Sequence, residues 1–253
     1  MNLILLEHEE VRRDGTAAVS DARAEHLLKV VKVAPGHVVR AGVIDGGSGV
    51  ATVMSVADGT VSLHCQFDMP MPARPPVDLL LALPRPKVMR RLWAQLAALG
   101  VGQIILTNAA RVERHYFDTH VLTASCYRPL LIEGLQQARD TRLPQVSIHK
   151  QFKVLVQDHL DGLFPTGLRL AADPRCEARL SEVVRTQARS MILLAVGPEG
   201  GWNDFELNLL AAHRFQAVGM GPRTLRSDTA CIALLTLVHD AAERAYNSIA
   251  DDD

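Results

Sequence analysis

Two glycine-rich corners in the last third of the chain constrain its fold more than any other feature. The apolar run Leu193–Val196 breaks at a Gly-Pro-Glu-Gly-Gly sequence that begins at Gly197, and a second break begins at Met220-Gly221-Pro222. Glycine accepts positive φ and, having no Cβ, lets a ligand or another segment come close. In open α/β sheets ligands bind beyond the carboxyl ends of the strands, so the two corners predict one shared pocket.

The residues after each corner predict the start of a helix. Asn203, followed three positions later by Glu206, has the form of a capping box, and the helix is expected to run to about His213. Ser227 or Asp228 is expected to cap a final apolar helix. Either corner taken alone is also consistent with a plain turn, because short glycine motifs match by chance.

The first part of the chain predicts a small β-barrel, because its apolar segments are short, β-branched and separated by turns. The expected strands are Leu3–Leu6, Val38–Val43, Gly49–Val56 and Val61–Phe67, with a helix over Arg23–Val33. Four prolines in the eight residues Met69–Pro76 mark a linker. We therefore expect two domains, at residues 1–72 and 73–253.

Beyond the linker, apolar strands alternate with helices. The expected strands are Asp78–Leu83, Gln103–Thr107, Gln145–His149, Leu168–Ala172 and Met191–Val196. Helices are expected between them, beginning near Pro86, Thr119, Phe152 and Glu177. Near-continuous apolar strands separated by helices are typical of a parallel sheet covered on both faces, so the second domain is predicted to be α/β.

Composition narrows the class of protein. No apolar run approaches the length of a membrane span, and the N-terminus lacks the pattern of a signal peptide, so we expect a soluble, cytoplasmic protein without a membrane segment. Four scattered cysteines and unclustered histidines predict no metal site. The net charge is −1, but residues 73–150 carry an excess of Lys and Arg. Phosphate contacts depend on such local patches, although each of these side chains is also consistent with a solvated helix face.

The sequences GPEGGW at Gly197–Trp202 and MGPRTLRSDTA at Met220–Ala230 resemble the signature of the RsmE family, the 16S ribosomal RNA uracil-N3 methyltransferases of the SPOUT class. The segment His26–Gly36, followed by Ile44-Asp45-Gly46, is similar to the family's PUA-like domain, with Lys32 where an arginine is common. Pro84–Lys87 and Ala98–Val101 resemble further family segments, with Ala98 replacing a glutamate. The chain also departs from the family at Gln136–Pro144.

The resemblance implies a fold and a function. It implies a PUA-like RNA-binding barrel at residues 1–72 and a SPOUT domain at 73–253, whose C-terminal segment forms a trefoil knot and which pairs as a homodimer. The implied reaction is methylation of uracil N3 in the decoding region of 16S RNA in the 30S subunit, with S-adenosylmethionine as cofactor. One alternative is a methyltransferase of the same class that modifies another RNA position or a ribose 2′-hydroxyl. The other is a ribosome-assembly factor that has lost catalysis.

The resemblance also implies site residues. The expected cofactor-binding residues are Ala172, Val196, Gly197, Pro198, Glu199, Gly200, Gly201, Met220, Gly221, Pro222, Leu225, Arg226 and Ser227. The expected RNA-binding residues are His26, Lys32, Arg85, Lys87, Arg111, Arg139 and Arg142. His26 is equally consistent with a packed histidine of the first domain.

Arg226 and Glu199 are the expected catalytic residues. The guanidinium of Arg226 is always charged and could hold a uracil oxygen as the imide loses its proton, or a neighbouring phosphate. The alternative is a structural salt bridge from Arg226 to Glu199 or Asp228. Glu199 could position the cofactor or accept the proton, and it could equally cap a turn. Asp228 is better explained as a helix cap than as a base.

Overall fold

The computed structural model describes residues 2–187 and 191–250, with side chains described up to Ala245. It divides into two compact units, which are described separately. The first comprises Met1–Arg74 and Leu131–Leu143, and the second comprises Pro75–Leu130 and Pro144–Asp253. Among the helices in the described ranges, none combines the length and the apolar character needed to cross a membrane.

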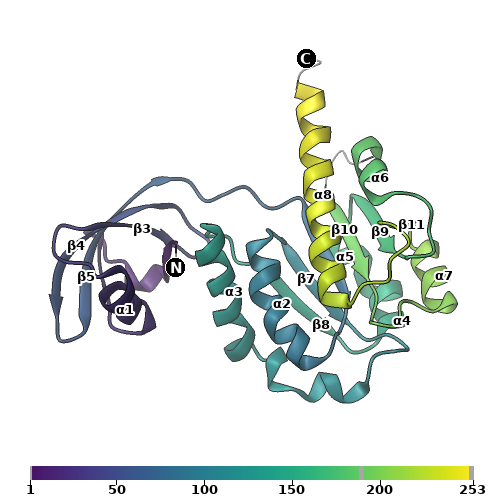
Figure 1. Cartoon of the computed structure of the whole chain (residues 1–253), viewed down its shortest axis with the longest axis horizontal. Helices are drawn as coiled ribbons and strands as arrows, with labels where there is room; N and C mark the ends of the chain where they lie inside the picture. The colour runs from purple at the N-terminus through teal and green to yellow at the C-terminus, as the bar shows by residue number, and fades with distance from the viewer. Residues whose placement is uncertain (1, 188–190, 251–253) are drawn as a thin grey trace. The chain divides into compact units, whose positions relative to one another are not determined.

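The first unit is a mixed five-stranded sheet curled around one core (Figure 1). Its strands are β1 (Ile4–Leu6), β2 (Thr16–Val19), β3 (Val38–Val43), β4 (Ser48–Ala57) and β5 (Thr60–Met69), in the order β1-β3-β4-β5-β2. Within this sheet, β1 and β3 pair in parallel, whereas the other neighbouring strands are antiparallel. β2 was not predicted, because the two alanines between Thr16 and Val19 leave only a weak strand pattern. The strand pairs with β5, and its residues Ala17 and Val19 are buried.

The helix expected over Arg23–Val33 forms in two parts, α1 (Ala22–His26) and the π-helical segment η2 (Leu27–Val31), after the short 3-10 helix η1 (His8–Glu10). Asp21 begins α1 by accepting a hydrogen bond from the Arg23 backbone N–H. Lys32 ends η2 with a left-handed φ of 58°.

Residues 131–143 belong to the first unit because they contact residues of that unit that lie about 100 positions earlier in the sequence. The Thr141 hydroxyl donates to the Gly46 carbonyl at 2.6 Å, and the Leu143 N–H donates to the Asp45 carboxylate at 2.8 Å. A division of the sequence at a single linker cannot capture such pairing, because nothing in the local pattern of residues 131–143 encodes it.

The second unit is built on a six-stranded sheet in the order β11-β9-β10-β6-β7-β8, and the predicted parallel arrangement is confirmed in every pair. The strands are β6 (Val77–Ala82), β7 (Gln103–Thr107), β8 (Gln145–His149), β9 (Leu168–Ala172), β10 (Ile192–Val196) and β11 (Phe215–Val218). All residues of β6, β7 and β10 are buried, which explains why these strands are apolar apart from Asp78, Gln103 and Thr107.

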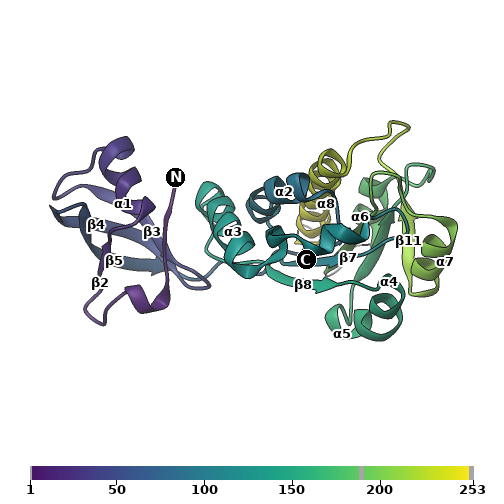
Figure 2. The ribbon, with the colours of Figure 1, turned by 90° about the horizontal axis from the view of Figure 1, so that it is seen from below.

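Helices cover both faces of this sheet, as Figure 2 shows for α2 and α8 on one side and α4 and α5 on the other. The helical segments are α2 (Pro86–Ala98), η3 (Arg114–Asp118), η4 (His120–Leu122), α3 (Ala124–Ala138), α4 (Phe152–Val154), η5 (Leu155–His159), α5 (Leu160–Leu163), α6 (Leu180–Gln187), α7 (Asp204–Ala212) and α8 (Ser227–Ala250).

Two helices begin later than the sequence predicts. α3 begins at Ala124 because residues 119–122 form a tight 3-10 turn in which Thr119 accepts a hydrogen bond from Val121. α6 begins at Leu180 because the preceding segment pairs with the second glycine corner, where the Gly219 N–H donates to the Ala178 carbonyl at 2.8 Å.

Arg169 on β9 is a buried cation that ties three segments together. Its guanidinium donates to the Asp161 carboxylate and the Phe164 carbonyl, both at 2.6 Å, and to the His213 carbonyl at 3.0 Å. The phenyl rings of Phe164 and Phe215 lie about 6 Å from its guanidinium carbon. The side chain therefore joins the segment before β9 to the end of α7.

Replacing Arg169 with methionine is expected to lower the free energy of unfolding of the second unit by about 2–4 kcal/mol, because two carbonyls lose their buried donor. Urea denaturation followed by circular dichroism measures the loss. Arg214→Met is the matched control, since Arg214 contacts the same carboxylate from an exposed position and should cost less than about 1 kcal/mol. Equal losses in the two variants would contradict this role for Arg169.

Candidate functional site

A pocket of about 400 Å³ lies at the carboxyl ends of β9, β10 and β11, three neighbouring strands of the second unit. Its walls are the segments that follow these strands, together with Arg111 and the start of α8. The two glycine corners therefore meet at one pocket, as their sequences predict. The volume lies in the range of small-molecule sites, roughly 300–1,000 Å³.

The first corner is held open by a turn and by the helix that follows it. The Gly201 N–H donates to the Pro198 carbonyl at 2.7 Å, and Gly201 has a φ of +71°. The predicted capping box is confirmed: the Glu206 N–H donates to the Asn203 side chain and the Asn203 N–H donates to the Glu206 carboxylate, both at 2.8 Å. The loop thus leads rigidly into α7.

The second corner depends on two glycines for different reasons. Gly221 has a φ of +130°, which side chains rarely tolerate. A Cβ at Gly219 would lie only 2.3 Å from the Cys176 carbonyl oxygen, so the segment after β9 approaches the corner too closely for any other residue. Gly219 precedes the sequence pattern that predicts this corner and was not expected to belong to it.

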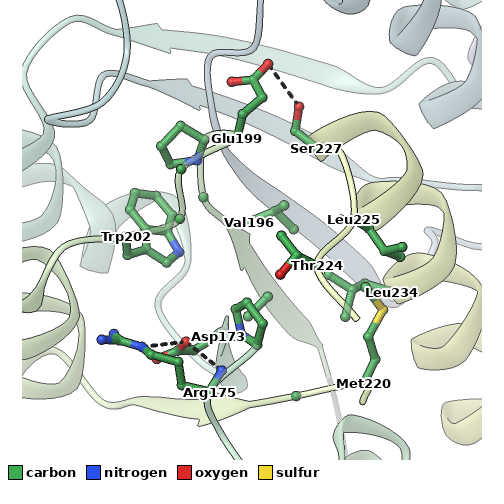
Figure 3. A pocket seen from close by; sticks show the side chains of 18 of the residues that line it. Asp173, Arg175, Val196, Glu199, Trp202, Met220, Thr224, Leu225, Ser227 and Leu234 are labelled. Carbon is green, nitrogen blue, oxygen red and sulfur yellow. Dashed lines mark hydrogen bonds and ion pairs between the residues drawn. The ribbon is translucent and has the colours of Figure 1, made fainter. Parts of the chain in front are cut away.

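The two corners are joined by a side-chain contact, visible at the top of Figure 3. The buried Ser227 hydroxyl donates to the Glu199 carboxylate at 3.4 Å. Ser227 is the first residue of α8, whereas Glu199 lies in the first corner. This contact connects the first turn of α8 to the loop after β10.

A third segment, the loop after β7, is attached to the first corner. Arg111 donates through its guanidinium to the Gly200 carbonyl. The buried Glu206 carboxylate also accepts a hydrogen bond from the Ala110 N–H at 2.6 Å. Arg111, predicted as an RNA contact, therefore lies in the wall of the pocket.

A charged cluster forms another wall. Asp173 accepts hydrogen bonds from the Arg175 backbone N–H at 3.0 Å and from its guanidinium at 3.1 Å. The same guanidinium reaches the Asp204 carboxylate at 3.3 Å. The cluster thus joins the segment after β9 to the first turn of α7, in the lower part of Figure 3.

Eleven of the thirteen predicted cofactor-binding residues line the pocket: Ala172, Val196, Gly197, Pro198, Glu199, Gly200, Gly201, Met220, Gly221, Leu225 and Ser227. Pro222 and Arg226, which are both exposed, do not line it. Trp202, Asp173, Arg175 and Leu234 also line it and were not predicted. Leu234 belongs to the apolar stripe of α8 and Trp202 is the last residue of the GPEGGW signature, but nothing in the sequence marks Asp173 or Arg175 as a pocket residue.

The salt bridges considered for Arg226 do not form within the part of the chain that the structure describes. Asp228 instead pairs with Arg91 at 3.0 Å, and its carboxylate accepts a hydrogen bond from the Thr229 N–H at 2.9 Å. Glu199 accepts from Ser227. Arg226 is exposed, and its two neighbours in the sequence, Leu225 and Ser227, both line the pocket.

The predicted RNA contacts belong to both units. Arg85 and Lys87 are exposed at the start of α2 in the second unit, whereas Lys32 and Arg139 are exposed in the first, where His26 is half-buried. Arg142 has a contact within the fold: its guanidinium donates twice to the Pro72 carbonyl, at 3.0 and 2.8 Å. In the described ranges, no group of His, Cys, Asp or Glu is arranged to hold a metal ion.

A parallel sheet covered by helices, with a glycine-lined pocket at the ends of its strands, is typical of a ligand-binding enzyme domain. Residues 72–239 match the model of the RNA methyltransferase domain family. The chain is 32% identical to the ribosomal RNA small subunit methyltransferase E of Treponema pallidum, over 94% of this chain and 90% of that protein. A namesake from Borreliella burgdorferi is 26% identical, over 92% and 95%. The chain belongs to the ribosomal RNA small subunit methyltransferase E family.

Solved structures share this fold at low sequence identity. The small subunit methyltransferase E of Neisseria gonorrhoeae, bound to S-adenosylmethionine, superposes with a TM-score of 0.76 at 19% identity, over 95% of this chain and 97% of that chain. A methyltransferase of Legionella pneumophila with bound cofactor gives a TM-score of 0.75 at 20% identity, with the same coverage. The expected SPOUT-type α/β fold is confirmed.

Proposed function

We propose that the protein transfers a methyl group from S-adenosylmethionine to N3 of a uracil in the decoding region of 16S ribosomal RNA in the 30S subunit. The observation that carries the proposal is the pocket between the two glycine corners, in a chain of this methyltransferase family. Related proteins are named for ribosomal small-subunit RNA, which supports the substrate class.

The pocket suits this cofactor in shape and chemistry. Val196, Met220, Leu225 and Leu234 offer apolar surface for an adenine ring, as Figure 3 shows around the centre of the cavity. Gly197 and Gly221 both line the pocket, where residues without side chains leave their backbone N–H and C=O groups uncovered for a ligand. The charged cluster of Asp173, Arg175 and Asp204 supplies polar partners at the opposite wall.

When bound, S-adenosylmethionine supplies a methyl group that is already activated by its sulfonium charge. The protein must then align the uracil and stabilise the negative charge that develops on its imide as the N3 proton leaves. We assign that stabilisation to Arg226, whose guanidinium is held by no carboxylate in the described residues. Glu199, fixed by Ser227 at the pocket wall, would orient the reactants or accept the proton.

The test is methyl transfer by the purified protein to 30S subunits that lack the modification. We expect labelled methyl from S-adenosylmethionine to appear as 3-methyluridine in nucleosides digested from 16S RNA. Label on a ribose 2′-hydroxyl, or on another base, would replace the proposed target. No transfer by a protein that binds cofactor would indicate a binding protein instead.

We further propose that residues 1–72 form a PUA-like domain that binds the RNA, and that the catalytic domain lies within residues 73–253, of which 131–143 belong to the first unit. The exposed Lys32 at the end of η2 supports this role, as does the family resemblance of the segment that contains it. In line with the family, the protein would act in the cytoplasm as a homodimer with a knotted C-terminal segment. Light scattering of the purified protein tests the dimer.

Replacing Lys32 with alanine is expected to weaken binding to 30S subunits about threefold to tenfold, without changing cofactor affinity. The slope of log binding constant against log salt concentration should become shallower by roughly one, which corresponds to one lost phosphate contact. Filter binding over a series of salt concentrations measures both. Lys29→Ala is the matched control, because Lys29 already pairs with Glu25 at 2.7 Å. Equal effects at the two lysines would argue against a specific contact at Lys32.

A further inference from the structure

Most polar side chains in the pocket wall already have a partner within the protein. Asn203 caps α7, and the others with a partner are Arg111, Asp173, Arg175, Glu199, Asp204 and Ser227. Two exposed polar side chains of the wall, those of Arg223 and Thr224, form no hydrogen bond or ion pair within the part of the chain that the structure describes. These two are therefore free to contact a ligand.

The two free side chains differ in how far their polar atoms are fixed. The Arg223 guanidinium is at the end of a long side chain with several rotatable bonds. The Thr224 hydroxyl is attached to Cβ, and branching at this atom restricts χ1, so that the direction of the hydroxyl depends mainly on the backbone. Thr224 was not among the residues expected to bind the cofactor.

The Thr224 hydroxyl is directed into the cavity, as Figure 3 shows. Thr224 is exposed, so a ligand in the pocket can reach the hydroxyl without moving the protein. The apolar side chains of Val196, Leu225 and Leu234 line the same cavity. A hydroxyl both donates and accepts hydrogen bonds, and one such group among apolar side chains fixes the orientation of a ligand.

The two portions of S-adenosylmethionine suit different parts of this pocket. The amino-acid portion carries a carboxylate and an ammonium group, and placing them unpaired against apolar surface is unfavourable. That portion fits the charged cluster of Asp173, Arg175 and Asp204, which lies in the lower part of Figure 3, away from Thr224. The adenosine portion has an apolar ring face and uncharged polar atoms, which match the surroundings of Thr224.

We infer that the Thr224 hydroxyl forms a hydrogen bond with the adenosine portion of S-adenosylmethionine and positions it in the pocket. This inference rests on the proposed function and adds a ligand contact to it. Because χ1 of Thr224 is already restricted, little side-chain freedom is lost when the contact forms. Thr224 binds and positions the cofactor and takes no part in proton transfer.

Two substitutions separate the hydroxyl from the shape of the side chain. Thr224→Val replaces the hydroxyl with a methyl group, and should weaken S-adenosylmethionine binding about threefold to tenfold, as measured by calorimetry. Thr224→Ser keeps the hydroxyl and should bind the cofactor within about twofold of the unmodified protein. Thr236→Val is the matched control, because Thr236 is exposed on α8, does not line the pocket and donates to the Ile232 carbonyl at 2.8 Å.

Unchanged affinity in a folded Thr224→Val variant would overturn the inference. Equal losses in Thr224→Val and Thr224→Ser would also contradict it, because they would assign the effect to packing and not to the hydroxyl. Circular dichroism confirms that each variant is folded. An unmodified protein that fails to bind S-adenosylmethionine would instead contradict the proposed function.

A second ligand, 5′-methylthioadenosine, tests the assignment to adenosine because it lacks the amino-acid portion. Thr224→Val should weaken binding of both ligands by the same factor, whereas a loss confined to S-adenosylmethionine would show that the adenosine assignment is wrong. Deaza and deoxy analogues of 5′-methylthioadenosine, each lacking one polar group, then identify the partner. The analogue without the partner should bind the unmodified protein and Thr224→Val equally well, and the same loss for every analogue would refute the contact.

Discussion

Replacing Gly221 with valine is expected to abolish measurable binding of S-adenosylmethionine, with a loss of affinity of at least about 100-fold. A β-branched side chain is strongly disfavoured at the observed φ of +130°, and its Cβ would lie 3.3 Å from the Arg179 guanidinium. Relief of that strain must move the Met220–Leu225 segment, which forms one wall of the pocket. Calorimetry measures the affinity, and circular dichroism confirms that the variant is folded.

Gly59→Val separates loss of the pocket from general backbone strain. Gly59 lies in the turn between β4 and β5 with a φ of +75°, and no atom outside the turn lies close to where its Cβ would be. We expect this variant to be less stable but to bind the cofactor normally. If both variants lose the cofactor, the effect of Gly221→Val is not local to the pocket.

Replacing Arg226 with lysine is expected to lower the single-turnover rate of methylation about 100-fold, while cofactor affinity stays within about twofold of the unmodified protein. Lysine keeps the charge but loses the planar two-point contact of the guanidinium. The structure favours separate effects on rate and binding, because Arg226 is exposed, does not line the pocket, and forms no salt bridge with Glu199 or Asp228.

Rates measured across a pH series identify what Arg226 contributes. If it stabilises the uracil anion, the deficit of Arg226→Lys should shrink at high pH, where the imide proton leaves more readily. Arg214→Lys is the control, since Arg214 is exposed, does not line the pocket and pairs with Asp161, so its rate should stay normal. A normal rate for Arg226→Lys at neutral pH would remove Arg226 from the mechanism, and a parallel loss of thermal stability would assign it a structural role.

The features that could be predicted from the sequence are those that local chemistry determines. The glycine corners are encoded by residues that alone accept the required backbone geometry, and the capping box by two side chains three positions apart. The buried strands are encoded by their continuous apolar runs. Each of these signals lies within one short segment.

Contacts between distant segments account for what the sequence did not show. Arg111 and Arg142, which are predicted to bind RNA, also donate to carbonyls of distant segments, at Gly200 and Pro72. A sequence shows a basic side chain but not the carbonyl that the fold brings beside it. The same limit applies to Trp202, whose ring packs against Phe152 and lies close to Gly197.

The most direct test of the account is the nucleoside content of 16S RNA from cells with and without this protein. We predict that deleting its gene removes 3-methyluridine from 16S RNA, as measured by mass spectrometry. Restoring the unmodified protein should bring the nucleoside back, and restoring the Gly221→Val variant should not. Unchanged 3-methyluridine in the deletion strain would contradict the proposed function.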